Sequence, residues 1–210
     1  MAVIRQKREK REKSAANSLV EFVVIIAVAL GLAIGIQAFL IKPFRIPSPS
    51  MVPTLEVGQR VLVNRIGTHF GDPDRGDVVV FKPPAGADDH RCGIPSQPAD
   101  GHPCSKPTDE KSENNFIKRV IGLPGDEVFV RNNRAYVNGK ALDEPYVRNT
   151  SCDELCNLPK PITVPPDHFF MMGDNRGESD DSRDWGPVPK DWIIGDAFFT
   201  YWPPGRIGTL

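Results

Sequence analysis

The sequence lacks an excess of positive charge. Its 210 residues include 26 lysines and arginines against 27 aspartates and glutamates, which leaves a net charge of −1. Proteins that bind nucleic acid generally need basic side chains to neutralise phosphates, so nucleic acid is not expected as a partner. Beyond residue 42 the sequence also lacks a segment with a convincing 3.6-residue hydrophobic period, and it has no internal repeat. A soluble helical domain and a repeat array are therefore not expected either.

One long apolar run is present, over residues 22–41, and it reads FVVIIAVALGLAIGIQAFLI. A helix of this length covers about 30 Å, the thickness of the hydrocarbon core of a bilayer. A buried helix of a soluble core rarely stays apolar on all sides for so long. The run therefore predicts one N-terminal transmembrane helix.

The alternative of a cleavable secretory signal requires a shorter apolar region that ends in a small-x-small site. This run ends in Phe39-Leu40-Ile41-Lys42, which offers no such site. Residues 1–21 carry six cations against three anions, a basic tail that favours a cytoplasmic N-terminus by the positive-inside tendency. We expect a basic tail over residues 1–21, an uncleaved anchor over 22–41 and an exported domain over 42–210.

The sequence has only four cysteines: Cys92, Cys104, Cys152 and Cys156. Outside the cell they would form disulfides, and four cysteines allow three pairings, all of which remain open. Zinc is an alternative, because His90-Arg-Cys92 and His102-Pro-Cys104 repeat an H-x-C pattern. That spacing matches no standard zinc module, so disulfides are the preferred interpretation.

After the apolar run, short apolar segments alternate with turn signals, which is typical of a mostly β protein. Strands are predicted over residues 60–64, 77–81, 115–121, 127–131, 135–137, 168–172 and 197–202. Asn138-Gly139 is a strong signal for a hairpin turn. Residues 83–115 are polar and rich in proline, and we expect them to form a surface excursion rather than core.

Three polar blocks carry the candidate chemistry. The first is PSPSMVPTL, residues 47–55, which places Ser48 and Ser50 just beyond the apolar run. Its prolines alone would suit an extended linker, but the neighbouring apolar residues Ile46, Met51 and Leu55 are not needed in a solvated linker.

The second block is FIKRVIGLPGD, residues 116–126. On a strand Lys118 shares a face with Val120; a solvated lysine is the usual case there, but burial would lower the pKa of the amine and make it a competent general base. The third block is MGDNRGESDDSRDWGPVP, residues 172–189. Its acids and arginines would form either a charged surface loop or a hydrogen-bonded ion network.

These blocks, SxSMxPTL, KRVIGLPGD and GDNRxxSxDSRxWG, resemble in order and spacing those of type I bacterial signal peptidase, a Ser/Lys dyad protease of the S26 family. The resemblance covers the region from about Phe44 to the C-terminus apart from residues 83–115. It implies an antiparallel fold of coiled sheets. It also implies a membrane-bound enzyme that needs no cofactor and no metal.

By this resemblance Ser50 is the nucleophile, Lys118 the general base and Ser48 a member of the oxyanion hole. Ser179 is expected to orient the lysine amine. The residues expected to form the supporting ion network are Asp174, Arg176, Asp181 and Arg183. The expected walls of a pocket for small side chains are Phe44, Ile46, Met51, Leu55, Phe116 and Ile117.

The resemblance implies that the enzyme removes signal peptides from exported preproteins by cutting after Ala-x-Ala sites, on the outer face of a bacterial cell membrane. Its expected partners are preproteins, membrane lipid and the export translocase. The aromatic residues Phe198, Phe199, Tyr201 and Trp202 would either contact lipid or belong to a β core.

Two alternatives remain. Self-cleaving repressor proteases share the Ser/Lys chemistry, but the anchor and the lack of a helix-turn-helix segment argue against them. A non-catalytic exported binding domain of the same fold is the other alternative, although such a relative would be free to lose the four matching residues Ser48, Ser50, Lys118 and Ser179. The role of the 83–115 excursion is open.

Overall fold

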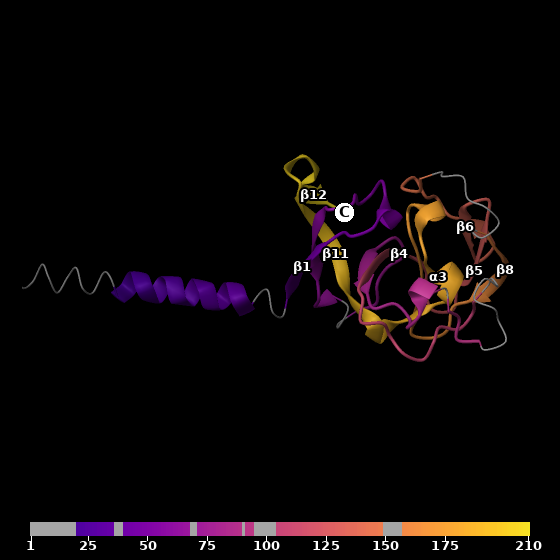
Figure 1. The fold of residues 1–210 in the computed structure, drawn as a ribbon, viewed down its shortest axis with the longest axis horizontal. Coiled ribbons are helices and arrows are strands. Elements are labelled where there is room, and N and C mark those ends of the chain that lie inside the picture. Colours follow the sequence, from indigo (N-terminus) through magenta and orange to yellow (C-terminus); the bar gives the residue numbers. More distant parts are fainter. Residues whose placement is uncertain (1–19, 36–39, 68–70, 90, 95–103, 149–156) are drawn as a thin grey trace, which may run out of the picture. The chain divides into compact units, whose positions relative to one another are not determined.

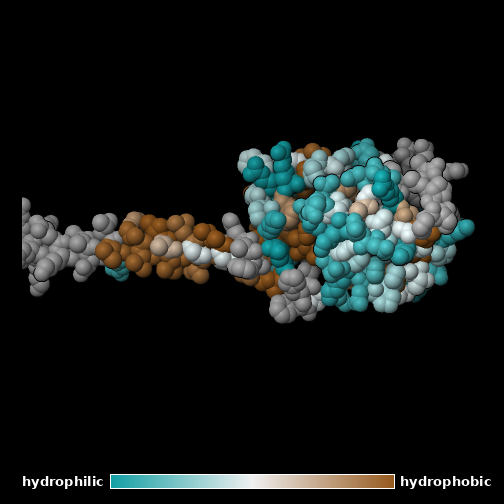
Figure 2. Space-filling model, turned by 60° about the horizontal axis from the view of Figure 1, so that its bottom comes forward, coloured by the Kyte–Doolittle hydropathy of each residue, from teal (hydrophilic) through white to brown (hydrophobic). Residues whose placement is uncertain are grey.

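A computed structural model describes residues 20–35, 40–67, 71–89, 91–94, 104–148 and 157–210. The chain divides into two compact units, residues Met1–Ile41 and Lys42–Leu210. In the first unit, residues 20–35 form a helix whose surface is apolar almost all round (Figure 2). Over the described part of the chain, no helix combines the length and the apolar character needed to cross a membrane.

The predicted apolar span extends to residue 41, but Leu40 and Ile41 are not helical, and Ile41 begins strand β1. Pro43 explains this difference, because proline disfavours helical backbone in the residue before it and cannot itself donate a helical hydrogen bond. Residues 36–39, which connect the helix to this point, lie outside the described residues.

The second unit is built mainly of antiparallel strands (Figure 1). The strands are β1 (Ile41–Arg45), β2 (Arg60–Asn64), β3 (Val78–Phe81), β4 (Phe116–Gly122), β5 (Glu127–Arg131), β6 (Arg134–Val137), β7 (Lys140–Ala141), β8 (Leu158–Thr163), β9 (His168–Met172), β10 (Val188–Pro189), β11 (Ile193–Trp202) and β12 (Gly208–Thr209). The short helices are η1 (Pro49–Met51), η2 (Ala87–Asp89), η4 (Arg176–Glu178), α3 (Ser182–Trp185), η5 (Lys190–Trp192) and η6 (Pro204–Arg206).

The strands form two sheets. The larger has the order β1-β2-β11-β3-β4-β9-β10, with β12 paired to β11, and the smaller has the order β7-β6-β5-β8. Asn138 and Gly139 both have positive φ at the β6–β7 hairpin, as the Asn-Gly signal predicts. The mostly β, antiparallel prediction is therefore confirmed.

Strand β4 lies inside the larger sheet, between β3 and β9, and is covered on both faces. On one face Val120 packs with Val79, Phe169 and Trp185, and Phe116 packs against this cluster. On the other face Ile117 and Ile121 belong to two further apolar clusters. Most side chains of β4 are therefore enclosed by other residues of the β unit.

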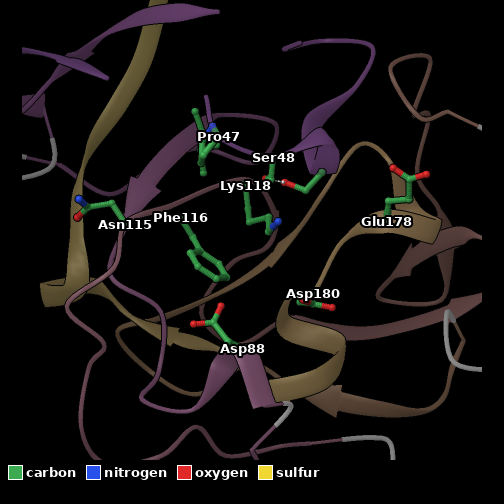
Figure 3. A pocket seen from close by; sticks show the side chains of 10 residues that line it. Pro47, Ser48, Asp88, Asn115, Phe116, Lys118, Glu178 and Asp180 are labelled. Carbon is green, nitrogen blue, oxygen red and sulfur yellow. Dashed lines mark hydrogen bonds between the residues drawn. The ribbon is translucent and has the colours of Figure 1, made fainter. Parts of the chain in front are cut away.

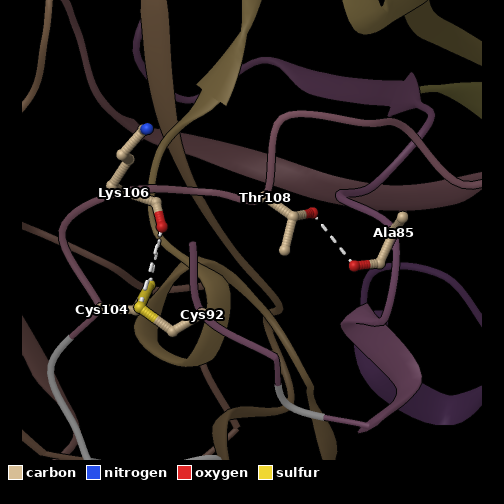
Figure 4. The surroundings of a disulfide bond; sticks show 5 residues. All are labelled: Ala85, Cys92, Cys104, Lys106 and Thr108. Atoms are coloured by element: carbon tan, nitrogen blue, oxygen red, sulfur yellow. Dashed lines mark hydrogen bonds between the residues drawn. A yellow bond between two sulfur atoms is a disulfide. The ribbon is translucent and has the colours of Figure 1, made fainter. Parts of the chain in front are cut away.

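The prediction that residues 83–115 form only a surface excursion is partly wrong. Ala87 and Cys104 are buried, and Ala87 belongs to the cluster that contains Trp185. The excursion is closed by a Cys92–Cys104 disulfide and by a hydrogen bond from Thr108 Oγ1 to the carbonyl oxygen of Ala85 (Figure 4). The segment is so rich in proline and polar residues that its sequence gives no signal for the few small apolar residues that pack into the core. Cys152 and Cys156 lie outside the described residues.

Candidate active site

Ser48 and Ser50 lie at the one-turn helix η1. Pro49 occupies its first turn, and Ser48, in extended backbone, precedes it. The two hydroxyl oxygens are 3.2 Å apart, and Ser50 is only 4% exposed. The apolar residues beside the serines explain this arrangement, because Met51 and Leu55 are fully buried beneath the turn and fix it to the core.

Lys118 lies in the middle of β4, opposite Val79 of β3. It is 3% exposed, and its amine lies 5.6 Å from the ring centroid of Phe116 on the same face of the strand. Burial lowers the pKa of Lys118 to about 8, and it outweighs the carboxylates of Asp181 and Asp180, which favour the charged amine. About a tenth of this amine is therefore neutral at pH 7, far more than for a lysine with the usual pKa of about 10.4.

A loop from the third block packs directly against the serine turn. The backbone N–H of Asn175 donates to the carbonyl oxygen of Ser50 at 3.0 Å, and its side-chain amide donates to that of Pro49 at 3.2 Å. Gly173 lies between Ser50 and Ser179, where a Cβ atom would come within 2.5 Å of the Ser50 carbonyl oxygen and 2.3 Å of Ser179 Oγ. Only glycine fits this close approach.

Ser179 is connected to the buried carboxylate of Asp181. The Ser179 hydroxyl donates to Asp181 Oδ2 at 2.8 Å, and Arg183 donates to both carboxylate oxygens at 2.8 and 2.9 Å. Burial would raise the pKa of Asp181, but Arg183 holds it below its usual range. Asp181 also caps α3 in a reciprocal capping box with Asp184, so one carboxylate fixes the loop, the helix and Ser179 together.

Asp174 and Arg176, which the sequence places in the same supporting network, have different partners. Arg119 donates to both oxygens of Asp174 at 2.9 and 2.7 Å, whereas Arg176 pairs with Glu144. Sequence analysis missed Arg119 and Glu144. Arg119 directly follows Lys118 in the KR motif, and this position in a motif was a signal that could have identified it. Nothing in the sequence indicated Glu144.

The serines and Lys118 line one cavity of about 240 Å³ (Figure 3). Phe116 and Ile117 lie in its wall, as expected. The other four predicted pocket residues are elsewhere: Ile46, Met51 and Leu55 are buried in the cluster beneath the serine turn, and Phe44 packs against that cluster.

Four further polar residues line the cavity that sequence analysis did not select: Asp88, Asn115, Glu178 and Asp180. Glu178 and Asp180 flank Ser179 in the third block, so the sequence could have indicated that they lie near the site. Asp88 and Asn115 belong to the excursion, whose contact with the site no motif indicates.

The arrangement can support proton transfer at a serine hydroxyl, because a buried amine with a lowered pKa and two hydroxyls line the same small space. Among the described residues there is no group of three or more side chains suited to hold a metal ion. The sulfurs of Cys92 and Cys104, considered above as zinc ligands, are bonded to each other.

Comparison with known proteins gives consistent results. The family model described as signal peptidase, peptidase S26, matches residues 19–202. The chain is 37% identical over 212 residues to a probable signal peptidase I-2 of Synechocystis sp., covering 99% of this chain and 84% of that protein. It is 38% identical over 199 residues to a signal peptidase I of Leptolyngbya laminosa, covering 95% of this chain and 87% of that protein.

A more distant relative is the signal peptidase IB of Staphylococcus aureus, 33% identical over 201 residues, covering 89% of this chain and 91% of that protein. Among solved structures, a signal peptidase I from Enterococcus faecalis matches with 30% identity and a TM-score of 0.40, over 60% of this chain and 97% of the other. The family match includes the serine turn, β4 and the third block. The chain therefore belongs to the signal peptidase family, peptidase S26.

Proposed function

We propose that the chain is a membrane-anchored serine endopeptidase that removes N-terminal signal peptides from exported preproteins through an acyl-enzyme on Ser50. The observation that carries this proposal is the buried Lys118 amine, with a pKa of about 8, in the cavity that also holds Ser48 and Ser50. A serine without a histidine partner needs such a base.

In the proposed mechanism the neutral amine of Lys118 takes the proton of the Ser50 hydroxyl while the oxygen attacks the scissile carbonyl. The Ser48 hydroxyl and the Ser50 backbone N–H donate to the oxyanion. The resulting ammonium gives its proton to the leaving amine, and the neutral Lys118 then activates the water that hydrolyses the acyl-enzyme.

Ser179 is proposed to orient the Lys118 amine. The Ser179 hydroxyl already donates its proton to Asp181, so its oxygen lone pairs are left to accept a hydrogen bond from the lysine. Two ion pairs support the proposal as architecture. The Asp174–Arg119 pair holds the third block against the strand that bears Lys118, and the Asp181–Arg183 pair fixes the third block internally around Ser179.

Specificity for small residues in an Ala-x-Ala pattern is proposed to arise from the small cavity. Phe116 and Ile117 supply apolar walls, and Ile46, Met51 and Leu55 form the packed layer beneath the serine turn. A large side chain would clash with such walls, whereas alanine fits.

We propose that residues 22–41 anchor the chain in a bacterial cell membrane with the N-terminus in the cytoplasm, and that membrane lipid and the export translocase are its partners. The apolar surface of the helix over residues 20–35 supports the anchor. On β11, Phe198 and Trp202 are 39% and 49% exposed, which favours lipid contact over a purely internal role for these two aromatics.

The test is cleavage of a preprotein with an Ala-x-Ala site by the full chain in a non-ionic detergent, alongside Ser50→Ala and Lys118→Ala. The wild type should cut after the second alanine, and both variants should fall to background while keeping the wild-type circular dichroism spectrum. A folded but inert wild type would instead favour the binding-domain alternative.

A further inference from the structure

Two carboxylates from distant parts of the chain, Asp88 and Glu178, line the cavity that holds Ser50 and Lys118. Asp88 belongs to η2 in the excursion, and Glu178 ends η4 in the third block. They lie on different sides of Lys118 (Figure 3). Asp180 is a third acid in the same lining. The space next to the nucleophile is therefore bordered by negative charge as well as by apolar walls.

The charges of Asp88 and Glu178 are not offset by cationic partners within the described residues. Asp88 Oδ2 accepts from the side-chain amide of Asn114 at 3.3 Å, and Glu178 Oε2 accepts from that of Asn175 at 3.3 Å. Both donors are neutral amides, which hold the carboxylates without neutralising them. Lys118, which lines the same cavity, offsets them in part when its amine is protonated, but its neutral form, which is proposed to act as the base, does not.

Asp88 is held in place rather than carried on a free loop. Its neighbour Ala87 is buried in the cluster that contains Trp185, and the Ala87 backbone N–H donates to the carbonyl oxygen of Pro84 at 3.0 Å. Trp185 in turn contacts the Phe116 ring edge-on, at 5.7 Å between centroids. The excursion thus fixes one acidic wall of the cavity, which gives this segment a role.

We propose that this cavity selects preproteins that carry a lysine or arginine within two residues of the scissile bond. This inference rests on the proposed function and adds a substrate class to it. The buried amine of Lys118 identifies the cavity as the place where the scissile bond binds, and the carboxylates border that place. A cation there gains attraction to two carboxylates, whereas an anion is repelled.

The test uses the full chain in a non-ionic detergent and three peptides with one Ala-x-Ala site that differ at the middle position, occupied by lysine, norleucine or glutamate. A second set places the same three residues directly after the cut. In at least one set, kcat/KM should fall in the order lysine, norleucine, glutamate. Each step should be about two- to fivefold, the size expected for a partly exposed charge pair.

Asp88→Asn and Glu178→Gln should each reduce the ratio of kcat/KM for lysine to that for norleucine. Asp89→Asn is the matched control, because Asp89 is the next residue of η2 but does not line the cavity. The ratio should also shrink between about 0.05 M and 0.5 M salt, since screening weakens exposed charge pairs but does not weaken a steric preference.

The outcomes separate this inference from the proposed function. If all three peptides of both sets are cleaved at equal rates, the inference is wrong and the proposed function stands. If Asp88→Asn and Glu178→Gln leave the ratio unchanged, or change it no more than Asp89→Asn does, the assignment to these two carboxylates is wrong. If no peptide or preprotein is cleaved by the folded chain, the proposed function fails and the inference fails with it.

Discussion

At the scale of the residue, the pKa of Lys118 makes the pH dependence of the reaction predictable. The proposed base is the neutral amine, whose fraction increases as the pH rises through about 8. The rate of peptide cleavage should therefore rise with pH along a limb whose apparent pKa is about 8. A pH–rate profile of kcat/KM between about pH 6 and 10 measures this limb; a rate that falls over this range would contradict a lysine base.

Asp180→Asn should move this limb to lower pH. The carboxylate of Asp180 favours the protonated amine and so raises the pKa of Lys118; its removal lowers that pKa further. Asp191→Asn should leave the limb in place, because Asp191 is not among the groups that shift Lys118. A limb that stays fixed in both variants would show that another group controls the profile.

Ser48→Ala tests the proposed oxyanion contact. Loss of one such donor should lower kcat by about 10²- to 10³-fold. Thermal unfolding should change little, because the Ser48 side chain is half-buried and, among the described residues, its hydroxyl hydrogen-bonds to that of Ser50. An unchanged kcat would remove Ser48 from the mechanism while leaving Ser50 and Lys118 in it.

Gly173→Ala should damage stability and activity together. The added methyl would overlap the Ser50 carbonyl oxygen and the Ser179 hydroxyl, and overpacking of this kind costs about 1–3 kcal/mol of unfolding free energy. Gly205→Ala is the control, since nothing lies within 4 Å of its added Cβ. Urea unfolding and peptide cleavage measure the two effects; a stable, active Gly173→Ala would mean that the loop can move away from the serine turn.

The residues of the proposed mechanism could be selected from the sequence because three motifs supplied Ser50, Lys118 and Ser179 by resemblance. The burial of Lys118, in contrast, could not be predicted from the sequence. On a strand, the alternation of Phe116, Lys118 and Val120 fits a solvated lysine equally well. Burial arises because η2 and α3, which have no helical period in the sequence, bring Ala87 and Trp185 over this face.

At the scale of the element, alternation of apolar residues predicted most strands of the two sheets, and proline explains why two of the others were missed. Strands β1 and β8 contain prolines, which read as breakers in the sequence. Both lie at the edge of a sheet, where a missing N–H costs no ladder hydrogen bond. Edge position depends on the pairing of distant segments, so a local pattern could not reveal it.

The Cys92–Cys104 disulfide should contribute to stability, because it closes the excursion over a separation of 12 residues. Replacement of both cysteines by alanine should lower the unfolding free energy by about 2–4 kcal/mol. Urea unfolding of the double variant measures this loss. Its control is Thr108→Val, which removes only the hydrogen bonds of this hydroxyl to the carbonyl oxygens of Ala85 and Glu110 and should cost less. Equal stability of wild type and double variant would show that the packed residues alone hold the excursion.

At the scale of the whole molecule, the apolar helix before the β unit leads us to predict how the chain is held in the membrane. Val28→Asp together with Leu30→Asp should release the chain from membranes on alkaline extraction, because each charge near the centre of a span costs about 2.5–3.5 kcal/mol. Val57→Asp is the control, an exposed apolar residue of the β unit. If the double variant stays in the membrane pellet as firmly as the control, residues 22–41 are not the anchor.

Neighbouring cations of β4 serve opposite faces: Lys118 lines the cavity, whereas Arg119 pairs with Asp174. Deletion of one residue between Phe116 and Lys118 would exchange these faces and present a guanidinium, which stays charged, where a neutral amine is needed. The excursion before this strand supplies Asp88 to the cavity wall, and a change of its length beyond the core residue Ala87 would alter that wall without moving Lys118. If the excursion selects substrates as proposed, insertions and deletions before Phe116 can change the choice of substrate. After Phe116, only substitutions keep Lys118 facing the cavity.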